Sequence, residues 1–312
     1  PFTSVFKSLY FDKEVEEELT RKIKDEKIDV IHFESFYTGF YISDKIKNLG
    51  VKQIFGTENI EFKIYQDYAR YVSSAVLKPA YYSEVRKIKA EEEEMMKKAD
   101  MCLAVTNQEA SIIKKITGKK CLVVENGVDT EDFKFKPFRK REGINIVFVG
   151  NFSYFPNLDA IKFFYNEIFS NLDRENIIFT IVGKNVEKLS FIKNRKVKMI
   201  SFVNDIKDIY KDADIFVSPI RIGGGTNFKV LEAMASGVPV VANFKRIQDL
   251  GVKDETHALN AYDKDTFIRQ ITRLINDPEF SKALSKNARD FIEKNYSWLV
   301  IGDKMNKIWK EL

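Results

Sequence analysis

Residues 214–242, DIFVSPIRIGGGTNFKVLEAMASGVPVVA, decide the fold. This segment begins with a short apolar run that ends at Pro219, passes through three successive glycines, and becomes amphipathic with helical spacing over residues 226–236. Gly237 then turns the chain into a second apolar run at residues 239–242. A strand, a helix and a second strand in this order predict a βαβ unit with parallel strands.

The same alternation extends along the whole chain, so the predicted fold class is α/β with doubly wound sheets. Short runs rich in Val, Ile and Phe, without strict alternation, are typical of parallel strands buried on both faces. Amphipathic stretches at residues 81–98, 157–170 and 205–211 are expected to be helices, and the four glutamates at 91–94 are expected to form a solvated helix face. The other expected strands lie at residues 29–33, 53–55, 101–105, 122–124, 144–150, 177–183, 197–202 and 215–219.

The length of 312 residues predicts about two domains. The polar stretch at residues 131–143 lacks an apolar period and marks a boundary, so we expect domains at residues 1–136 and 137–290. Residues 291–312 are expected to form a carboxy-terminal helix that crosses back to the first domain. Only about four strands precede the boundary, and the chain opens with Pro1 rather than Met. We therefore expect an amino-terminally truncated product with an incomplete first domain.

Composition excludes several classes of protein. Hydrophobic residues make up 44% of the chain and charged residues 31%, which is typical of a globular protein. The net charge of +5 is spread along the chain without a basic arm, which argues against a nucleic-acid binder. The two His and two Cys form neither CxxC nor HExxH, so we expect no metal site, and the widely separated cysteines favour a reducing, cytoplasmic compartment.

The glycine loop and the helix after it have the properties of a phosphate site. Thr226 and Asn227 are both suitable as N-cap residues of that helix. Glycines let the backbone approach a ligand closely, and the first N–H groups of a helix favour an anion. Lys229 and Glu232 are one turn apart and share a face, which suits a diphosphate joined to a ribose diol. A glycine-rich turn followed by a surface Lys–Glu pair is the alternative interpretation.

Several spaced motifs together resemble the retaining GT-B glycosyltransferases of family 4, the glycosyltransferase group 1 type. In the second half, the resemblance rests on VVENGVD at residues 123–129, FVGNFSYFPN at 148–157, IVGK at 181–184 and FVND at 202–205, besides the glycine loop. In the first half it rests on DVIHFE at residues 29–34 and TENIE at 57–61, and the chain closes on a helix at 288–298 similar to the family's closing segment. The resemblance covers nearly the whole chain.

The resemblance implies transfer of a sugar from a nucleotide-diphosphate donor with retention of configuration. It also implies two Rossmann-like domains that face each other across a cleft, and a reaction that needs no metal ion and no cofactor. The partners would be the nucleotide sugar and a glycan, lipid-linked or small-molecule acceptor. The implied location is cytoplasmic, with a peripheral contact at the inner face of the membrane as a further expectation.

For the donor, the resemblance implies that Glu232 holds the ribose diol and that Lys229 and the backbone of the glycine loop hold the phosphates. The nucleobase would lie near two short segments that each follow an expected strand. The residues expected to bind the donor are Gly223, Gly224, Gly225, Thr226, Asn227, Lys229, Glu232, Arg221, Asn151, Gly183, Lys184, Phe202 and Val203.

The chain departs from the family pattern at two donor positions. Gly224 stands where the family usually has the first of two glutamates, which leaves the donor-sugar contact unassigned. Asn151, Tyr154 and Asn157 take the place of the usual basic pair. Arg221 could replace that pair with bidentate phosphate contacts, and a structural ion pair with a neighbouring carboxylate is the equal alternative.

In the first domain, His32 and Glu34 alternate along a strand and reach its carboxyl end, where α/β sheets place ligands. Together with Lys229 they are the expected catalytic residues. Glu34 stands where many relatives have a histidine. A single histidine at a strand end, such as His32, often has a structural role instead. Asn59 and Glu61 match the family and are expected in the cleft. In the mechanism that the resemblance implies, the departing phosphate takes the acceptor proton and no enzyme nucleophile is needed.

Two other classes of function remain open. A paralogue that binds nucleotide sugars without transferring them would share these motifs, and only turnover separates it from an enzyme. A nicotinamide dehydrogenase is disfavoured, because no GxGxxG opens a first βα turn with an acidic residue about twenty positions later.

Overall fold

The computed structural model describes residues 3–71, 74–136, 143–172, 175–222 and 227–312. Contacts divide the chain into two compact units, and each is described by itself. The first unit contains Pro1–Glu125 and Asp303–Leu312, and the second runs from Asn126 to Gly302. Helix α13 (Trp298–Lys310) contributes residues to both units.

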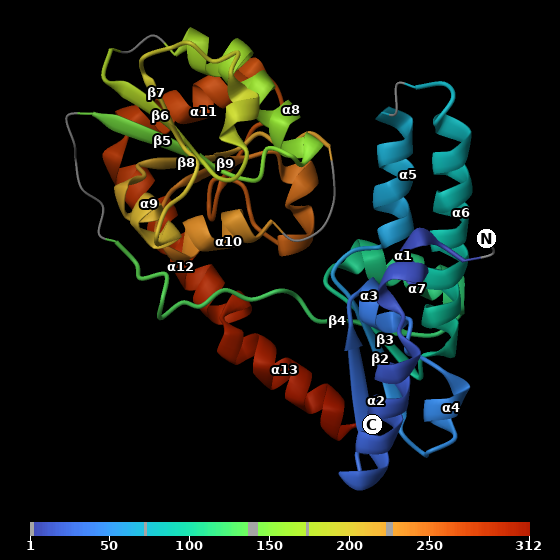
Figure 1. Ribbon diagram of the computed structural model, residues 1–312. Helices are drawn as coiled ribbons and strands as arrows, with labels where there is room; N and C mark the ends of the chain where they lie inside the picture. The colour runs from blue at the N-terminus through green and yellow to red at the C-terminus, as the bar shows by residue number, and fades with distance from the viewer. Residues whose placement is uncertain (1–2, 72–73, 137–142, 173–174, 223–226) are drawn as a thin grey trace. The chain divides into compact units, whose positions relative to one another are not determined.

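The first unit is built on a four-stranded parallel sheet in the order β1-β2-β3-β4 (Figure 1). One face of the sheet packs a hydrophobic core that includes Phe33, Phe55 and Cys102 with residues of α5, α6 and α7. The elements are α1 (Val5–Tyr10), α2 (Lys13–Asp25), β1 (Val30–Glu34), α3 (Phe36–Gly39), α4 (Asp44–Lys47), β2 (Lys52–Thr57), α5 (Glu61–Tyr71), α6 (Lys78–Lys98), β3 (Met101–Ala104), α7 (Asn107–Thr117) and β4 (Cys121–Val123).

The second unit has a six-stranded parallel sheet in the order β10-β9-β8-β5-β6-β7. Counted within the unit, this is the doubly wound order 3-2-1-4-5-6, read from the other edge, so the α/β prediction is confirmed. The elements are β5 (Ile144–Val149), α8 (Phe155–Phe163), η1 (Phe164–Ile168), η2 (Phe169–Asn171), β6 (Ile177–Val182), η3 (Val186–Leu189), β7 (Val197–Ile200), α9 (Ile206–Asp212), β8 (Ile215–Ser218), α10 (Phe228–Ala235), β9 (Val240–Ala242), η4 (Phe244–Arg246), η5 (Gln248–Leu250), β10 (Leu259–Asn260), α11 (Lys264–Asn276) and α12 (Pro278–Tyr296).

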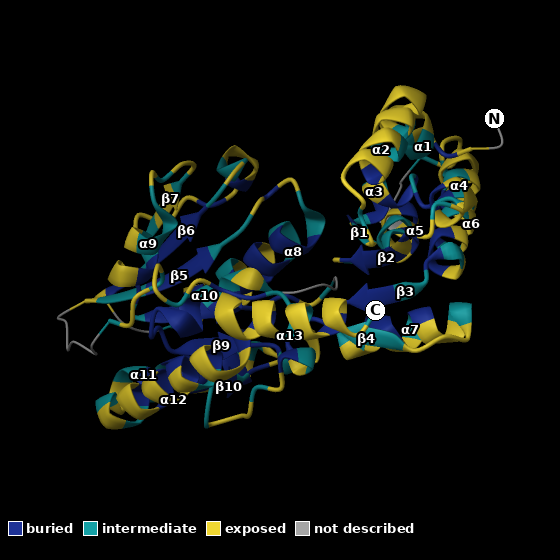
Figure 2. Ribbon diagram, turned by 90° about the horizontal axis from the view of Figure 1, so that it is seen from below, coloured by how far each residue is buried: buried dark blue, intermediate teal, exposed yellow. Residues whose placement is uncertain are grey.

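Helices cover both faces of this sheet. Alternate residues of β5 point to opposite sides: Ile146 and Phe148 belong to the core under α8 and α11, whereas Val147 belongs to the core under α9, α10 and α12. In Figure 2 most strands of the second unit are buried, whereas the edge strand β7 exposes Lys198 and Met199 and the helices expose one side. This burial on both faces explains why the strand sequences are apolar throughout.

Three local expectations differ from the structure. The helix expected at residues 157–170 begins at Phe155, because Pro156 fits the first turn, and becomes a π-helix at Phe164. The closing helix expected at residues 288–298 breaks at Ser297, whose extended backbone bridges to Val128 before α13 begins. The two-residue strand β10 is too short for an apolar run to predict it.

The boundary between the units also lies earlier than the boundary predicted between residues 136 and 137. Residues 126–136 are polar in sequence but pack on the second unit, where Phe133 contacts its core. The guanidinium of Arg289 donates to the carbonyls of Thr130, Phe133 and Ala235 at 2.8, 2.5 and 2.6 Å. A buried cation that donates to three carbonyls fixes this segment, and composition does not reveal it.

The glutamate run at residues 91–94 forms a solvated face only in part. Glu93 and Glu94 pair with lysines of α6 as expected. Glu92 is instead fully buried, and it accepts the first N–H groups of α5, from Glu61 and Phe62, at 2.9 Å each. Burial raises the pKa of Glu92 to about 8 despite these two hydrogen bonds.

Cys102 and Cys121, far apart in sequence, occupy paired positions on the neighbouring strands β3 and β4. Both are free thiols, and burial raises their pKa values to about 11 and about 12. The thiolate is the reactive form, so both side chains are chemically quiet near neutral pH.

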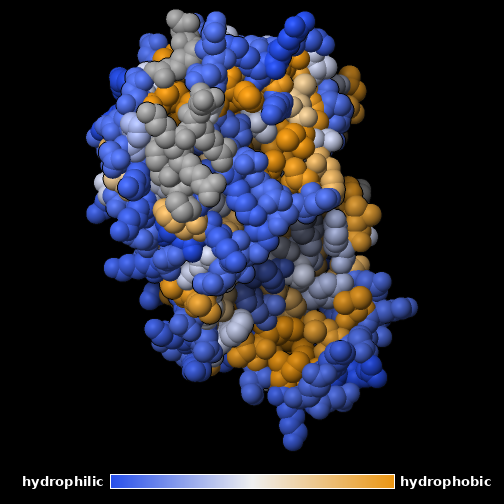
Figure 3. Space-filling view, turned by 90° about the vertical axis from the view of Figure 1, so that its left-hand side faces the viewer, coloured by the Kyte–Doolittle hydropathy of each residue, from blue (hydrophilic) through white to orange (hydrophobic). Residues whose placement is uncertain are grey.

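Hydrophilic side chains cover most of the face drawn in Figure 3, with hydrophobic residues in patches between them. Over the ranges that the structure describes, no helix is long and apolar enough to span a bilayer.

Candidate functional site

The order of the strands locates a candidate site in the second unit. The chain reverses direction across the sheet between β5 and β8, which pair directly with each other. In an open α/β sheet, ligands bind outside the carboxyl ends of the strands at such a switch point. The segments that leave β5 and β8 there contain Asn151 and Arg221, and α10 begins a few residues after Arg221.

Lys229 lies in the first turn of α10 with its ammonium group held in place. Nζ donates to Oδ1 of Asn157 at 2.7 Å and lies 4.5 Å from the ring centroid of Phe148. Burial lowers the pKa of Lys229 to about 7, and the nearby carboxylate of Glu232 opposes this shift. The cation is thus fixed in space and poorly solvated, which favours contact with an anion.

Glu232 lies one turn further along α10. Its Oε2 accepts a hydrogen bond of 2.7 Å from the hydroxyl of Tyr210, which is fully buried in α9. Burial raises the pKa of Glu232, whereas Tyr210 and Lys229 lower it. Half-buried and orientated by one partner, this carboxylate retains acceptor capacity for a vicinal diol.

Helix α10 begins at one of the two expected caps, without the expected capping hydrogen bond. The helix begins at Phe228 with Asn227 as its N-cap, but the Asn227 side chain makes no capping hydrogen bond and donates to the carbonyl of Arg246 at 2.8 Å. The expected donor residues Gly223, Gly224, Gly225 and Thr226 lie outside the described residues.

Arg221 forms an ion pair with a neighbouring carboxylate, the second of its two expected roles. Its Nη2 and Nε donate to the two carboxylate oxygens of Asp159 at 2.7 and 3.1 Å, and the guanidinium lies 4.4 Å from the ring centroid of Phe163. This bidentate pair engages the edge of the guanidinium formed by Nε and Nη2. The pair also holds α8 against the segment after β8.

Asn151, just after β5, also has its oxygen atoms engaged in hydrogen bonds. Its side-chain oxygen accepts from the backbone of Ser153 at 3.0 Å and from the amide of Asn185 at 2.9 Å, and its carbonyl accepts from Asn157. Asn151 therefore orientates Asn157, which in turn binds Lys229. The structure gives Asn151 a supporting position beside Lys229, one of the residues expected to bind the donor.

The two segments expected near the nucleobase follow β6 and β7. Gly183 has φ +141°, and a Cβ there would lie 1.9 Å from the carbonyl oxygen of Gly150, so only glycine fits. Lys184 and Phe202 are exposed, Phe202 with 77% of its surface, and Val203 is half-buried. An aromatic ring that is exposed at the carboxyl end of a strand is available for stacking on a base.

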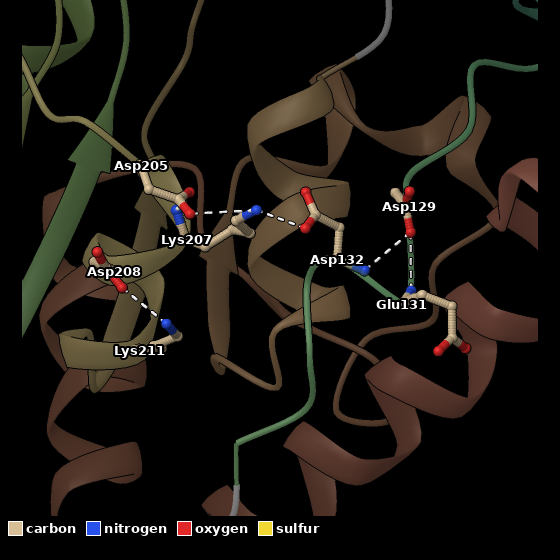
Figure 4. Close-up of polar contacts among 7 residues, drawn as sticks. All are labelled: Asp129, Glu131, Asp132, Asp205, Lys207, Asp208 and Lys211. Atoms are coloured by element: carbon tan, nitrogen blue, oxygen red, sulfur yellow. Dashed lines mark hydrogen bonds and ion pairs between the residues drawn. The ribbon is translucent and has the colours of Figure 1, made fainter.

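The motif at residues 123–129 has a structural role at Asp129 (Figure 4). Its Oδ1 accepts from the backbone N–H groups of Glu131 and Asp132 at 3.0 and 2.9 Å. Lys207 of α9 then bridges Asp132 at 2.5 Å and Asp205 at 3.2 Å. These contacts tie the segment after β4 to the second unit and account for its position there.

His32 and Glu34 are brought together in the first unit, as their alternation predicts. Nε2 of His32 lies 2.9 Å from Oε2 of Glu34, yet the contact lacks hydrogen-bond geometry, so Nε2 is buried without a hydrogen-bond partner among the described residues. Both atoms lie over Gly56 of β2, where a Cβ would come within 2.5 Å of each. Gly56 therefore makes the space for this pair.

Trp309 of α13 completes the surroundings of His32, and the motifs do not predict it. The two rings meet edge to face with centroids 6.4 Å apart, and 46% of Trp309 is exposed. Nζ of Lys304, in the same helix, bonds Oε2 of Glu125 at 2.6 Å. The only sequence signal that could have indicated it is that both tryptophans of the chain, Trp298 and Trp309, lie in this amphipathic helix near the chain end.

Asn59 and Glu61 lie around the beginning of α5. The carbonyl of Asn59 accepts the hydroxyl of Thr57, and the backbone N–H of Glu61 donates to Glu92. Burial, and then the charge of Glu58, raise the pKa of Glu61. The contacts of Asn59 and Glu61 are those of a helix start, and their expected place in a cleft stays a prediction.

Lys229 gives the expected donor site a testable pH dependence. A bound diphosphate raises the pKa of a nearby ammonium, so the complex holds a proton that the free protein loses above a pH of about 7. Affinity for a nucleotide sugar should therefore fall above that pH, by up to about tenfold per pH unit, with proton uptake on binding. Calorimetry in buffers of different ionisation enthalpy measures this uptake, and Lys229→Met should remove it. An affinity that is constant through this range would contradict the assignment.

Comparisons with known proteins agree with the two-unit architecture. A model of "Glycosyltransferase Family 4" matches residues 1–132, and a model of "Glycosyl transferases group 1" matches residues 143–277. In solved structures, HepE of Anabaena in complex with UDP superposes with a TM-score of 0.76 at 13% identity, over 96% of this chain and 82% of its own. This likeness confirms the GT-B fold with Rossmann-like units.

Two curated relatives match a large part of the chain. An uncharacterized glycosyltransferase of Methanocaldococcus jannaschii is 25% identical over 70% of this chain and 60% of its own length. The UDP-Gal:alpha-D-GlcNAc-diphosphoundecaprenol alpha-1,3-galactosyltransferase of Escherichia coli is 27% identical over 62% of this chain and 54% of its own. The chain thus spans between about half and 60% of the length of these relatives. With each half matched by a glycosyltransferase family model, the chain belongs to the glycosyltransferases of the GT-B fold.

Proposed function

We propose that the protein transfers a sugar from a nucleotide-diphosphate donor to a glycan or lipid-linked acceptor with retention of configuration. The observation that carries the proposal is the pair Lys229 and Glu232 at the switch point of the second sheet, one turn apart and each orientated by a partner from another helix. HepE was solved in complex with UDP, and the name of the E. coli relative gives a UDP-sugar and a lipid-linked acceptor, so UDP-sugars are the first donors to test.

In this proposal each part of the donor meets a matching group. The diphosphate lies against Lys229 and the N-terminus of α10, where the ammonium and the free N–H groups offset its charge. Glu232 accepts hydrogen bonds from the ribose diol. The nucleobase extends toward Gly183 and stacks on the exposed ring of Phe202.

The reaction then breaks the bond between the anomeric carbon and the diphosphate oxygen, and forms a bond from the acceptor hydroxyl on the same face of the sugar. Negative charge develops on the departing diphosphate, where Lys229 stabilises it more strongly in the transition state than in the bound donor. The departing phosphate oxygen takes the acceptor proton, so the protein supplies no nucleophile. Glu34 and His32 act on the acceptor side: they orientate the hydroxyl and assist the transfer of its proton to the phosphate oxygen.

A panel of nucleotide sugars tests the donor half of the proposal. The true donor should raise the midpoint of thermal unfolding, because a ligand that binds only the folded protein stabilises it by mass action. Incubation with that donor and candidate acceptors, followed by measurement of the anomeric coupling in the product by NMR, tests retention. Donor binding without any turnover would favour a binding paralogue.

The proposed reaction needs no metal ion, since Lys229 and backbone N–H groups hold the phosphates. We expect transfer to continue in EDTA at a rate within about twofold of the untreated rate, a smaller change than the loss of one charge-assisted contact would cause. Release of nucleoside diphosphate, followed with and without chelator, measures this. A loss of activity that Mg²⁺ or Mn²⁺ restores would show that a metal shares the phosphate site.

A further inference from the structure

Arg246, in the short helix η4 after β9, joins two residues that flank the glycine loop in sequence. Its Nη2 donates to the backbone carbonyl of Arg221, which follows β8. Its own carbonyl accepts from Nδ2 of Asn227, the N-cap residue of α10, at 2.8 Å. Arg246 therefore lies beside both the segment that leaves β8 and the beginning of α10.

Hydrogen bonds from neighbouring strands fix the backbone around Arg246. Asn243 is buried directly after β9; its N–H donates to the carbonyl of Ser218 at 3.2 Å, and its carbonyl accepts from the N–H of Arg246 at 2.9 Å. The N–H of Phe244 donates to Oδ1 of Asn260 at 3.2 Å. Arg246 itself is exposed. A guanidinium has five N–H donors, enough to hold protein carbonyls and an anion at the same time.

The strand order gives the direction in which a donor would lie. The two segments proposed for the nucleobase follow β6 and β7, and Lys229 reaches Asn157 of α8, the helix after β5. Arg246 follows β9, which lies on the far side of β8 from β5. A donor that extends along the carboxyl ends of the strands from its base would pass Lys229 first. It would reach Arg246 with the phosphate that is further from the base.

The diphosphate needs more positive charge than Lys229 supplies, because it carries more than one negative charge. Asparagines and a tyrosine take the place of the family's usual basic pair. Arg221, the expected substitute, instead binds the carboxylate of Asp159. Arg246 is a guanidinium on the other side of the same segment, and arginine matches the geometry of phosphate oxygens.

We propose that Arg246 binds the terminal phosphate of the nucleoside diphosphate, the phosphate that is bonded to the sugar in the donor. The carbonyl of Arg221 orientates the guanidinium, and Lys229 contacts the diphosphate from the side of β5. When the bond between the anomeric carbon and this phosphate breaks, its electron pair stays on the phosphate oxygen, where Arg246 offsets the charge. The inference rests on the proposed function, because it adds a residue to the same donor site.

Calorimetric titration with UDP and with UMP tests the proposal. Arg246→Met should lower the affinity for UDP about ten- to a hundredfold, the range of a lost charge-assisted contact, and should change the affinity for UMP by less than about twofold. UMP retains the base, the ribose and the first phosphate. A variant that only moved the beginning of α10 would therefore weaken the binding of both ligands. GDP and GMP form the equivalent pair if the protein prefers guanine.

A second variant and a matched control make the test specific. Arg246→Gln retains an N–H donor for the carbonyl of Arg221 but removes the charge, so it should show the same selective loss of UDP affinity. Arg195→Met changes an exposed arginine that precedes β7, at the opposite end of the strands, and should leave both affinities unchanged. The midpoint of thermal unfolding shows whether each variant is folded.

The outcomes separate this inference from the proposed function. The assignment of Arg246 is overturned if both of its variants bind UDP like the Arg195→Met control, or if they lose affinity for UMP as much as for UDP. Lys229→Met should still weaken UDP binding in either case, which would leave the proposed function in place. A wild-type protein that binds neither UDP nor GDP would contradict the proposed function, and this inference with it.

Discussion

Glu34→Gln is expected to slow sugar transfer by between tens and about a thousandfold without abolishing it, the range of lost positioning or acid–base assistance. Glutamine retains the shape of the side chain beside His32 but removes its charge. His32→Asn should give a loss in the same range. Donor binding, measured by calorimetry, should be unchanged, because neither residue belongs to the second unit.

Two further variants make this test specific. Glu14→Gln, an exposed glutamate in the first turn of α2, is the matched control and should leave transfer unchanged. Gly56→Ala should lower transfer although it changes no polar group, because the added Cβ lies within 2.5 Å of both side chains and must displace them. If Gly56→Ala is folded and as active as the wild-type protein, the position of the pair does not matter.

The competing mechanism uses Glu34 as a nucleophile, and it predicts a different result. Glu34→Gln would then abolish transfer, and the wild-type protein would accumulate a covalent sugar on that carboxylate. Intact-protein mass spectrometry after incubation with a fluorinated donor detects such an adduct. An added sugar mass on Glu34 would refute the front-side mechanism.

Lys229→Met and Glu232→Gln are each expected to weaken nucleoside-diphosphate binding by about 1–3 kcal/mol, or roughly five- to 150-fold. Methionine fills the space of the lysine stem beside Phe148 without a charge, and glutamine retains an acceptor for Tyr210. Both variants should therefore fold. Calorimetric titration with UDP and GDP measures the loss.

Lys282→Met and Glu279→Gln provide the matched control for the second pair. These exposed residues lie three positions apart on α12, the same separation as Lys229 and Glu232 on α10. Neither change should affect nucleotide affinity. If Lys229→Met and Glu232→Gln bind UDP and GDP like this control pair, the donor assignment is wrong.

The strands were predictable because parallel strands buried on both faces must be apolar, whatever their neighbours are. The short edge strand β10 and the change to a π-helix at Phe164 depend on packing against elements distant in sequence. Contacts assign residues 126–136 to the second unit, before the predicted boundary, for a related reason. Composition marks residues 131–143 as polar, but Arg289, more than 150 residues away, binds the carbonyls of Thr130 and Phe133.

The candidate sites divide in the same way. Pairs close in sequence, such as Lys229 with Glu232, follow from helical or strand spacing, and the structure orientates them as that spacing requires. The groups that hold them come from other elements, and no local pattern indicates Tyr210 beside Glu232 or Trp309 beside His32. The choice between phosphate and carboxylate as partner for Arg221 likewise depended on the distant Asp159.

A crystal structure of the protein with a bound nucleoside diphosphate tests the central claim most directly. The predicted result places the diphosphate at the N-terminus of α10 with an oxygen within hydrogen-bond distance of Nζ of Lys229, and the ribose hydroxyls on the carboxylate of Glu232. A nucleotide bound to the first unit, or one whose ribose makes no contact with Glu232, would contradict the account.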